Sequence, residues 1–470
     1  MNQEPRIFTP DQFSRRSFLK RGSAALGGAA LASTLAPSRF ALGAGGGDEI
    51  KLAIVGCGGR GSGACAQALN TTNLGPIKLV AAADVHEDRM ESALKNFEAK
   101  FGERAQVAKE NRFLGFDAYK KAISQADVVI LSTPPGFRPM MFEEAIKQGK
   151  HVFMEKPVAT DPAGVRKVLA AAKIAQEKGL KVGVGLQRHH QKGYIETIQR
   201  LHDGAIGDIT SMRAYWNGNT PWLKKRADLE KQYGRKLTEM EYQMRNWYYF
   251  AWICGDHIVE QHIHNLDVIN WVKKGYPVKA QGMGGCEVRK GEDYGEIFDH
   301  HAVEFEYADG SRLSSYCRHI VGCWNSVSEH VQGTKGKSDV GRNTISPTTG
   351  DAWRHKGEGD KDPYQQEHDD LFAAIRNNTP YNEAERGAMS SMTAILGRLA
   401  TYGGKEIEMG SYDLDPKLTD EQKKKEKQNK AIWSDVTLFP KNLAWDAEMA
   451  VKPGPDGMYP RAIPGKTVVI

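Results

Sequence analysis

The chain has 470 residues, which is too long for one ordinary hydrophobic core and indicates two domains with additional segments. Its formal charge is +6, but residues 1–44 hold six basic and two acidic residues, a local +4, so the remainder carries only about +2. This balance gives no reason to expect a nucleic-acid partner. No later apolar run reaches about 18 residues, so we expect no stable insertion into a membrane.

The first 44 residues predict an export signal. The segment from Ser14 to Lys20 reads SRRSFLK and precedes a weakly apolar run of Ala, Gly and Leu. Paired arginines in this setting resemble a twin-arginine signal, which would direct the protein to the periplasm or the extracellular space. The alternative is a basic disordered tail, and the cleavage position stays open between about residues 36 and 44.

Residues 50–63 (IKLAIVGCGGRGSG) predict a strand, a tight turn and the start of a helix. Three glycines form the pattern G-x-G-x-x-G. Gly56 allows the turn, Gly58 lets a pyrophosphate approach the backbone, and Gly61 lets the helix pack close to the strand. We therefore expect a dinucleotide-binding turn, with a glycine-rich loop that binds nothing as the alternative.

A second apolar run, residues 78–83, ends at Asp84, which lies 23 residues after Gly61. An acid at the end of the second strand is placed to hold the hydroxyls of a ribose. A carboxylate there would repel a 2′-phosphate. The predicted cofactor is therefore NAD rather than NADP.

Residues 48–187 predict a doubly wound parallel sheet. Apolar strand candidates and helical segments alternate through this region, at residues 87–101 (helix), 126–132 (strand), 142–149 (helix), 151–154 (strand) and 180–186 (strand). Ligands of such sheets bind at the carboxyl ends of the strands.

Residues 188–405 predict a second domain with a mostly antiparallel sheet. Its strand candidates are residues 209–216, 280–288, 301–307 and 312–317, and its helix candidates are residues 258–273, 364–377 and 384–403. A charged and aromatic insertion occupies residues 221–250. Residues 406–470 form a tail that is mostly polar.

Two further motifs suggest chemistry. Glu155-Lys156-Pro157 follows the strand at residues 151–154, on the cofactor side of the sheet. An amine in a partly desolvated site beside a cationic nicotinamide suits a proton shuttle for an alcohol. In the predicted helix at 258–273, Glu260, His264 and Asp267 are spaced by four and three residues and share one face, so the carboxylates are expected to orient the imidazole.

A metal site is the alternative interpretation of this second motif. His257, Glu260, Gln261 and His264 lie on adjacent turns, at and just before the start of the predicted helix, and carry suitable ligand atoms. No H-E-x-x-H pattern or further clustered ligand set accompanies them. We therefore predict no metal.

In this order, the motifs resemble the glucose–fructose oxidoreductase and inositol dehydrogenase (Gfo/Idh/MocA) family over about residues 50–402. The matching features are the glycine turn, a strand ending in Thr133-Pro134, Glu155-Lys156-Pro157, and a helix ending in His264-x-x-Asp267. The resemblance implies a Rossmann domain followed by an α/β domain with an open-faced sheet. It also implies a homodimer or homotetramer, Lys156 as the catalytic lysine, and His264 on the substrate hydroxyl.

The sequence departs from the family pattern at two positions. Glu260 stands where the family more often has Asp, and Arg138 stands where it has His. An arginine there could bind a carboxylate or a hydroxylated substrate, or reach the cofactor phosphate. The aromatic residues in and around the insertion either stack on sugar rings or belong to the core.

The predicted site residues form three groups. The catalytic residues are Lys156, His264 and Glu260; the cofactor-binding residues are Gly56, Gly58, Gly59, Arg60, Gly61, Asp84, Thr133, Pro134, Arg138, Glu155 and Lys156; the substrate-binding residues are Arg188, Trp216, Trp247, Tyr248, His264 and Asp267.

These observations predict an exported NAD-dependent oxidoreductase that acts on a hydroxyl of a sugar, cyclitol or glycoside. Free NAD is scarce outside the cytoplasm, so the protein is expected to be exported folded, with its cofactor tightly bound and recycled in place. Two alternatives stay open: a redox-neutral NAD-dependent glycosidase or lyase of the same superfamily, and a non-catalytic sugar-binding protein.

Overall fold

Six parallel strands form the first sheet of the computed structural model, which describes residues 49–410, 433 and 437–469. The strand order β3-β2-β1-β4-β5-β6 confirms the predicted doubly wound sheet. The strands are β1 (Ile50–Val55), β2 (Ile77–Asp84), β3 (Arg112–Leu114), β4 (Val128–Leu131), β5 (His151–Met154) and β6 (Val182–Val184). The central strands β1 and β4 are buried almost throughout, which explains their nearly continuous apolar sequences. The predicted export signal lies outside the described residues.

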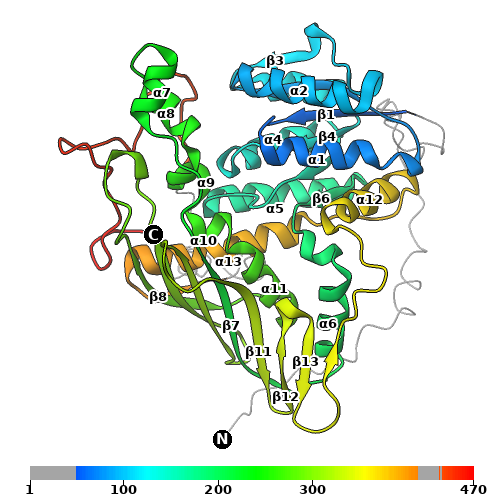
Figure 1. Ribbon diagram of the computed structural model, residues 1–470, viewed down its shortest axis with the longest axis vertical. Helices are drawn as coiled ribbons and strands as arrows, with labels where there is room; N and C mark the ends of the chain where they lie inside the picture. Colours follow the sequence, from blue (N-terminus) through cyan, green and yellow to red (C-terminus); the bar gives the residue numbers. More distant parts are fainter. Residues whose placement is uncertain (1–48, 411–432, 434–436, 470) are drawn as a thin grey trace, which may run out of the picture. The chain divides into compact units, whose positions relative to one another are not determined.

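Helices connect these strands and cover the sheet (Figure 1). They are α1 (Gly59–Asn70), α2 (Glu87–Phe101), α3 (Ala118–Gln125), α4 (Arg138–Lys147) and α5 (Pro162–Glu177). Helix α5 shows why such a segment becomes helical. Asp161 accepts a hydrogen bond from the Gly164 amide at 2.7 Å, Pro162 occupies the first turn, and Val165 and Val168 begin a buried stripe.

In the described part of the chain, nine strands form the second sheet, in the order β14-β13-β12-β11-β7-β10-β9-β8-β15. They are β7 (Ile209–Gly218), β8 (Lys279–Gly285), β9 (His300–Glu306), β10 (Arg312–His319), β11 (Ser326–Gly333), β12 (Gly336–Asp339), β13 (Thr344–Pro347), β14 (Trp353–Arg354) and β15 (Ile407–Glu408). Strands β7 and β10 run parallel, and the other neighbours run antiparallel. The sequence correctly predicted a mostly antiparallel sheet, but strands β11 to β15 were not predicted.

Helix α13 (Ala384–Gly403) joins the two sheets. It packs on β8 and β9 of the second sheet and on α5 beside the first, and it lies between α5 and the second sheet in Figure 1. Side chains alternate between buried and accessible along β9 and β10, so helices cover one face of the second sheet and leave the other open. The remaining helices are α6 (Lys192–His202), α7 (Arg226–Tyr233), α8 (Glu239–Arg245), α9 (Ala251–Cys254), α10 (His257–Glu260), α11 (Ile263–Lys273) and α12 (Pro363–Arg376).

The single helix predicted over residues 258–273 is wrong, because α10 and α11 are separated by Gln261 and His262. The amides of both residues bond to the His257 carbonyl, at 3.0 and 3.2 Å. The ring Nε2 of His262 lies 2.7 Å from Ser315 Oγ on β10, which holds this turn against the sheet. The break changes which way the predicted catalytic side chains face.

The described part of the tail, residues 437–469, packs on the same chain. Asp161 accepts hydrogen bonds from the Thr437 hydroxyl and the Leu438 amide, both at 2.7 Å. Tyr459 donates to Glu239 of α8 at 2.7 Å. The tail therefore contacts both the first domain and the insertion at residues 221–250.

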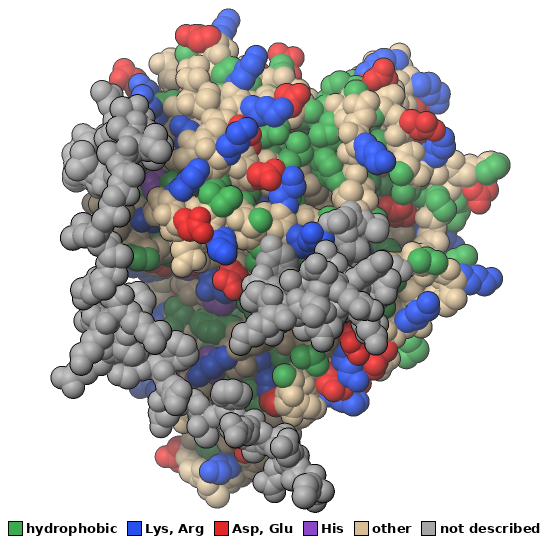
Figure 2. All heavy atoms as spheres, turned by 180° about the vertical axis from the view of Figure 1, so that it is seen from behind, with side chains coloured by type: hydrophobic (Ala, Val, Ile, Leu, Met, Phe, Trp, Pro, Cys, Tyr) green, Lys and Arg blue, Asp and Glu red, His purple; other side chains and the backbone are tan. Residues whose placement is uncertain are grey.

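The described surface mixes charges of both signs. On the face shown in Figure 2, basic and acidic side chains are interspersed, without an extended field of one sign. Among the described residues, no helix combines the length and apolar character that crossing a bilayer requires.

Candidate active site

A cavity of about 660 Å³ opens at the carboxyl ends of the first sheet's strands. Its first wall is formed by Gly56, Gly58, Gly59, Arg60, Gly61, Asp84, Thr133, Pro134, Arg138, Glu155 and Lys156. Its second wall includes Trp216, Trp222, Met244, Trp247, Tyr248, Glu260, Gln261 and His264. The structure thus gathers every predicted cofactor-binding residue on one side and the three predicted catalytic residues around the same space. Their functional roles stay predictions.

The glycine turn has the geometry that a bound dinucleotide requires. A Cβ on Gly61 would lie 2.1 Å from the Gly56 carbonyl oxygen, and one on Gly56, whose φ is +93°, would lie 2.5 Å from the Thr133 nitrogen. A Cβ on Gly59 would meet nothing within 4 Å, because this residue faces open space. The start of α1 therefore presents bare backbone to the cavity, which fits a pyrophosphate at a helix N-terminus.

Asp84 braces this turn. One carboxylate oxygen accepts the Cys57 amide at 2.7 Å and the other accepts the His86 amide at 2.8 Å. Burial raises the pKa of Asp84, although these amide hydrogen bonds oppose the shift. Each oxygen keeps a lone pair, so the carboxylate can also accept a hydrogen bond from a ribose hydroxyl.

Arg138 ties two strand ends together. Its guanidinium donates one hydrogen bond to the Thr133 carbonyl, after β4, and another to the Pro157 carbonyl, after β5. The side chain is buried, and burial lowers its pKa to about 10. Sequence reasoning placed this arginine on a substrate or on the cofactor phosphate. In the structure its terminal nitrogens bond to the Thr133 and Pro157 carbonyls, and its role toward a ligand stays a prediction.

Lys156 reaches across the cavity to the second wall. Its Nζ donates to the Glu260 carbonyl at 2.6 Å and lies 3.0 Å from the Glu260 carboxylate. The two side chains are only 14% and 13% exposed. The contact joins the end of β5 to the end of α10, so the amine is fixed where the two domains meet.

His264 has no carboxylate partner, contrary to the sequence expectation. Glu260 pairs with Lys156, while Asp267 is buried and bonds to His189 and Ser390, each at 2.8 Å. The His264 ring stacks on Trp216, with centroids 5.9 Å apart, and its Nδ1 is buried without a partner among the described residues. Burial and the nearby positive charge of Lys156 lower the pKa of His264 well below its usual value. The imidazole is therefore neutral at pH 7.

Arg188 and Asp267 do not line the cavity, although both were predicted to bind substrate. Arg188 forms an ion pair with Glu329 of β11, a fully buried carboxylate that also accepts hydrogen bonds from Tyr194 and Asn265. Burial opposes the charge of Arg188, but Glu329 outweighs it and raises the pKa of the guanidinium. These side chains stabilise the packing beneath the site rather than its surface.

Aromatic side chains shape the second wall. Trp222 packs edge-on against Trp247 and Tyr248, with ring centroids 5.7 and 6.1 Å away. The Tyr248 hydroxyl is buried, and none of the described residues bonds to it. An unpartnered buried hydroxyl beside a cavity is explained most simply by a polar ligand.

Comparison with known proteins supports this interpretation of the first domain. Residues 50–186 match the GFO_IDH_MocA model, described as an oxidoreductase family with an NAD-binding Rossmann fold. The match covers the first domain, from β1 to just beyond β6, and no more of the chain.

Relatives of this chain are distant. An inositol 2-dehydrogenase from Ralstonia nicotianae is 26% identical over 56% of this chain and 66% of its own length. A 2,7-anhydro-N-acetylneuraminate hydratase from Mediterraneibacter gnavus is 25% identical over 45% of this chain and 50% of its own. An uncharacterized oxidoreductase from Streptococcus pneumoniae is 25% identical over 45% of this chain and 51% of its own length. The chain thus spans about half to two thirds of the length of these relatives.

Solved structures show the fold over more of the chain. Aldose–aldose oxidoreductase from Caulobacter crescentus matches with a TM-score of 0.60 and 18% identity, covering 77% of this chain and 100% of that protein. A levoglucosan dehydrogenase matches with a TM-score of 0.59 and 14% identity, covering 77% of this chain and 99% of that protein. The chain therefore shares the two-domain fold of these proteins over 77% of its length.

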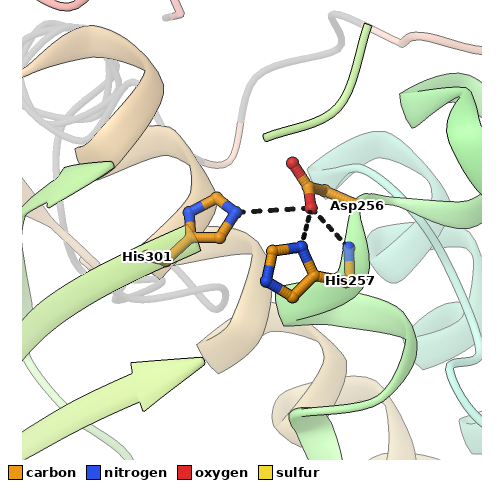
Figure 3. A group of neighbouring side chains, drawn as sticks. All are labelled: Asp256, His257 and His301. Atoms are coloured by element: carbon orange, nitrogen blue, oxygen red, sulfur yellow. Dashed lines mark hydrogen bonds and ion pairs between the residues drawn. The ribbon is translucent and has the colours of Figure 1, made fainter. Parts of the chain in front are cut away.

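The four residues of the alternative metal interpretation do not converge. His257 turns to Asp256, Glu260 to Lys156 and Gln261 to His319. A different group, Asp256, His257 and His301, comes together in the interior and is buried (Figure 3).

Hydrogen bonds already engage the Asp256 carboxylate. One oxygen accepts from the backbone and from the ring Nδ1 of His257, the latter at 2.8 Å, and lies 3.3 Å from His301 Nε2. The other accepts from the Phe298 amide at 3.0 Å and the Tyr402 hydroxyl at 2.6 Å. Asp256 also has a positive φ of 75°, a strained conformation for a non-glycine residue. We interpret this group, the Asp256 cluster, as a structural anchor for α10.

Sequence reasoning missed several residues on the cavity wall. Gln261 was considered only as a metal ligand, and Met244 and Tyr364 were not considered. Tyr364 lies in the first turn of α12, and the Arg60 guanidinium lies over its ring, 4.9 Å from the centroid. Arg60 in turn pairs with Glu155 at 2.6 Å. No local signal marks Tyr364, because only the fold brings α12 to the glycine turn.

Proposed function

We propose that this protein is an exported, NAD-dependent oxidoreductase that acts on a hydroxyl of a sugar, a cyclitol or a glycoside. One observation carries the proposal. Lys156 and His264 come from different domains and line the same cavity, whose floor is the bare backbone of the glycine turn. The names of the inositol dehydrogenase relative and of the aldose–aldose oxidoreductase support a polyol or sugar as the substrate.

The residues of the chain divide the chemistry between them. The nicotinamide of a bound NAD supplies the hydride acceptor. Lys156 passes a proton to the Glu260 carboxylate, 3.0 Å from its Nζ, and the resulting neutral amine takes the proton of the substrate hydroxyl. His264 is neutral, so it contacts the same hydroxyl as a hydrogen-bonding group without adding a second positive charge.

Export and cofactor retention belong together in this proposal. The twin-arginine-like segment at residues 14–20 would send a folded protein to a compartment where free NAD is scarce. The tail supports retention, because the Trp445 ring packs on Phe116 and His86, two residues that line the cavity near Asp84. A retained cofactor is then re-oxidised in place, by a second substrate or by a later step on the same one.

The proposal also includes a homodimer or homotetramer. The open face of the second sheet supports it, because Tyr215 stacks there on Tyr316 and contacts Trp324 edge-on, with centroids 5.6 and 5.4 Å away. Trp324 is 64% exposed, which is unusual for so large an apolar side chain.

The test is Lys156→Met in the purified full chain. We expect loss of nicotinamide reduction by myo-inositol, D-glucose and levoglucosan, with unchanged cofactor content, because the methionine keeps the side-chain bulk but cannot accept a proton. Lys147→Met, at an exposed position on α4, is the matched control and should keep wild-type rates. Normal turnover by Lys156→Met would refute the assignment.

A redox-neutral activity is the second candidate, favoured by the 2,7-anhydro-N-acetylneuraminate hydratase among the relatives. In this case a transient ketone would ease elimination or hydrolysis elsewhere on the same sugar. Incubation with an aryl glycoside in D2O separates the two. Deuterium in the released sugar without net oxidation indicates the redox-neutral route, and net oxidised product indicates the dehydrogenase.

A further inference from the structure

Gln261 lies at the break between α10 and α11, and its side chain lines the cavity between Glu260 and His264. Its Oε1 lies 2.8 Å from His319 Nε2. None of the described residues accepts a hydrogen bond from its Nε2. Which end of this amide faces the ligand therefore depends on the protonation of His319.

His319 is fixed by an arginine. Its Nδ1 lies 2.8 Å from Arg289 Nη2, and both side chains are about 1% exposed. A guanidinium can only donate, so Nδ1 must be the accepting nitrogen of the ring. The ring proton is then on Nε2. Burial, together with His257 and Arg289, lowers the pKa of His319, which keeps the ring neutral with a single proton.

Arg289 is itself held in place. Its Nη1 donates to the Phe298 carbonyl at 3.0 Å, and its guanidinium lies over the Tyr249 ring, 5.2 Å from the centroid. The order of donors is therefore set from the protein interior outward. Arg289 donates to His319, and His319 donates to Gln261 Oε1. The Gln261 NH2 group is left as the end that faces the cavity.

We propose that Gln261 is a specificity-determining residue, whose NH2 donates a hydrogen bond to a substrate oxygen next to the reacting carbon. The proposal rests on the proposed function, because Lys156, Glu260 and His264 define where that carbon lies. It deepens the proposed function by naming the substrate class: a ring with an accepting oxygen adjacent to the oxidised hydroxyl, such as a vicinal diol or an ether-bridged sugar. Arg289 and His319 are positioning residues for this donor.

Gln261→Glu tests the donor directly. The glutamate has the same shape and still accepts from His319, but it turns an accepting oxygen toward the substrate. We expect kcat/KM to fall roughly 10- to 100-fold for each probe that the wild type oxidises among myo-inositol, levoglucosan and D-glucose, with unchanged content of bound NAD. Gln176→Glu, at an exposed position of α5, is the matched control and should leave these constants unchanged.

The positioning role has its own readout. In protein labelled with 15N-histidine, the His319 ring, assigned with His319→Asn, should carry its proton on Nε2 in the wild type. Arg289→Met should shift this ring toward the other tautomer and lower kcat/KM roughly 2- to 10-fold without changing the content of bound NAD.

The outcomes separate this proposal from the proposed function. A wild-type protein that oxidises none of the probes contradicts the proposed function, and the role of Gln261 is lost with it. Wild-type turnover with unchanged constants in Gln261→Glu overturns the role of Gln261 alone. A wild-type His319 protonated on Nδ1 overturns the positioning by Arg289.

Discussion

Replacement of Asp256 by asparagine tests the interpretation of the Asp256 cluster as a structural anchor. The carboxylate is fully buried and accepts four hydrogen bonds, two on each oxygen, with His301 as a further neighbour. In Asp256→Asn, the new NH2 group must face one pair of these donors. Either the His257 groups or the Phe298 amide and the Tyr402 hydroxyl then lose their acceptor.

The expected loss follows from these contacts. Leaving one buried N–H without an acceptor costs about 1–3 kcal/mol, and losing hydrogen bonds to a charged group adds about 1.5–3 kcal/mol. We therefore expect the free energy of unfolding to fall by about 3–5 kcal/mol. The assay is urea unfolding followed by circular dichroism at pH 7, with NAD saturating for every variant.

Asp309→Asn is the matched control. Asp309 also accepts several hydrogen bonds, but its side chain is 56% exposed, so its loss should cost less than about 1 kcal/mol. A loss below 1 kcal/mol in Asp256→Asn would refute the anchor. A drop in wild-type stability on adding EDTA would instead assign a metal to the cluster.

Two further predictions concern pH and cofactor retention. Burial disfavours the charged form of His190, but hydrogen bonds to Asp370 and Glu383 outweigh it and raise its pKa to about 9. This pKa is above the value of about 6.5 in the unfolded chain, so protonated His190 stabilises the folded protein. The stabilisation is complete below pH 6.5 and is lost as the pH rises through 9. The difference in free energy of unfolding between wild type and His190→Gln should therefore shrink between pH 6 and 10. Trp445→Ala removes a ring 4.8 Å from that of Phe116, so NAD should dissociate roughly 3- to 30-fold faster in stopped-flow displacement.

Each of these predictions has a contradicting result. If the difference in free energy of unfolding between wild type and His190→Gln grows with pH, the predicted pH dependence is wrong. Trp324→Ala, on the open face of the second sheet, is the control for Trp445→Ala and should release NAD at the wild-type rate. Equal release rates in the two variants would show that the tail does not retain the cofactor.

The first domain could be predicted from sequence because its signals are local. The buried parallel strands are short apolar runs, and the glycines and Asp84 lie at the strand ends where the fold requires them. Strand β11 gave no such signal. Its sequence SVSEHVQG is largely polar, and its buried Glu329 is stable there only because Arg188, 141 residues away, pairs with it.

The second wall of the site could be predicted only in part. Spacing placed Glu260, His264 and Asp267 on one helical face, but the break at Gln261 and His262 separates Glu260 from the other two. Asp267 then finds His189, and Glu260 finds Lys156, at sequence separations of 78 and 104 residues. A helical pattern contains no information about such distant partners.

A crystal structure of the protein purified with its own cofactor tests the central claim most directly. We expect NAD with its pyrophosphate at Gly58 and Gly59 and its nicotinamide ring facing Lys156 and His264. An empty glycine turn, or a nicotinamide ring on the far side of the cavity from Lys156, would contradict it.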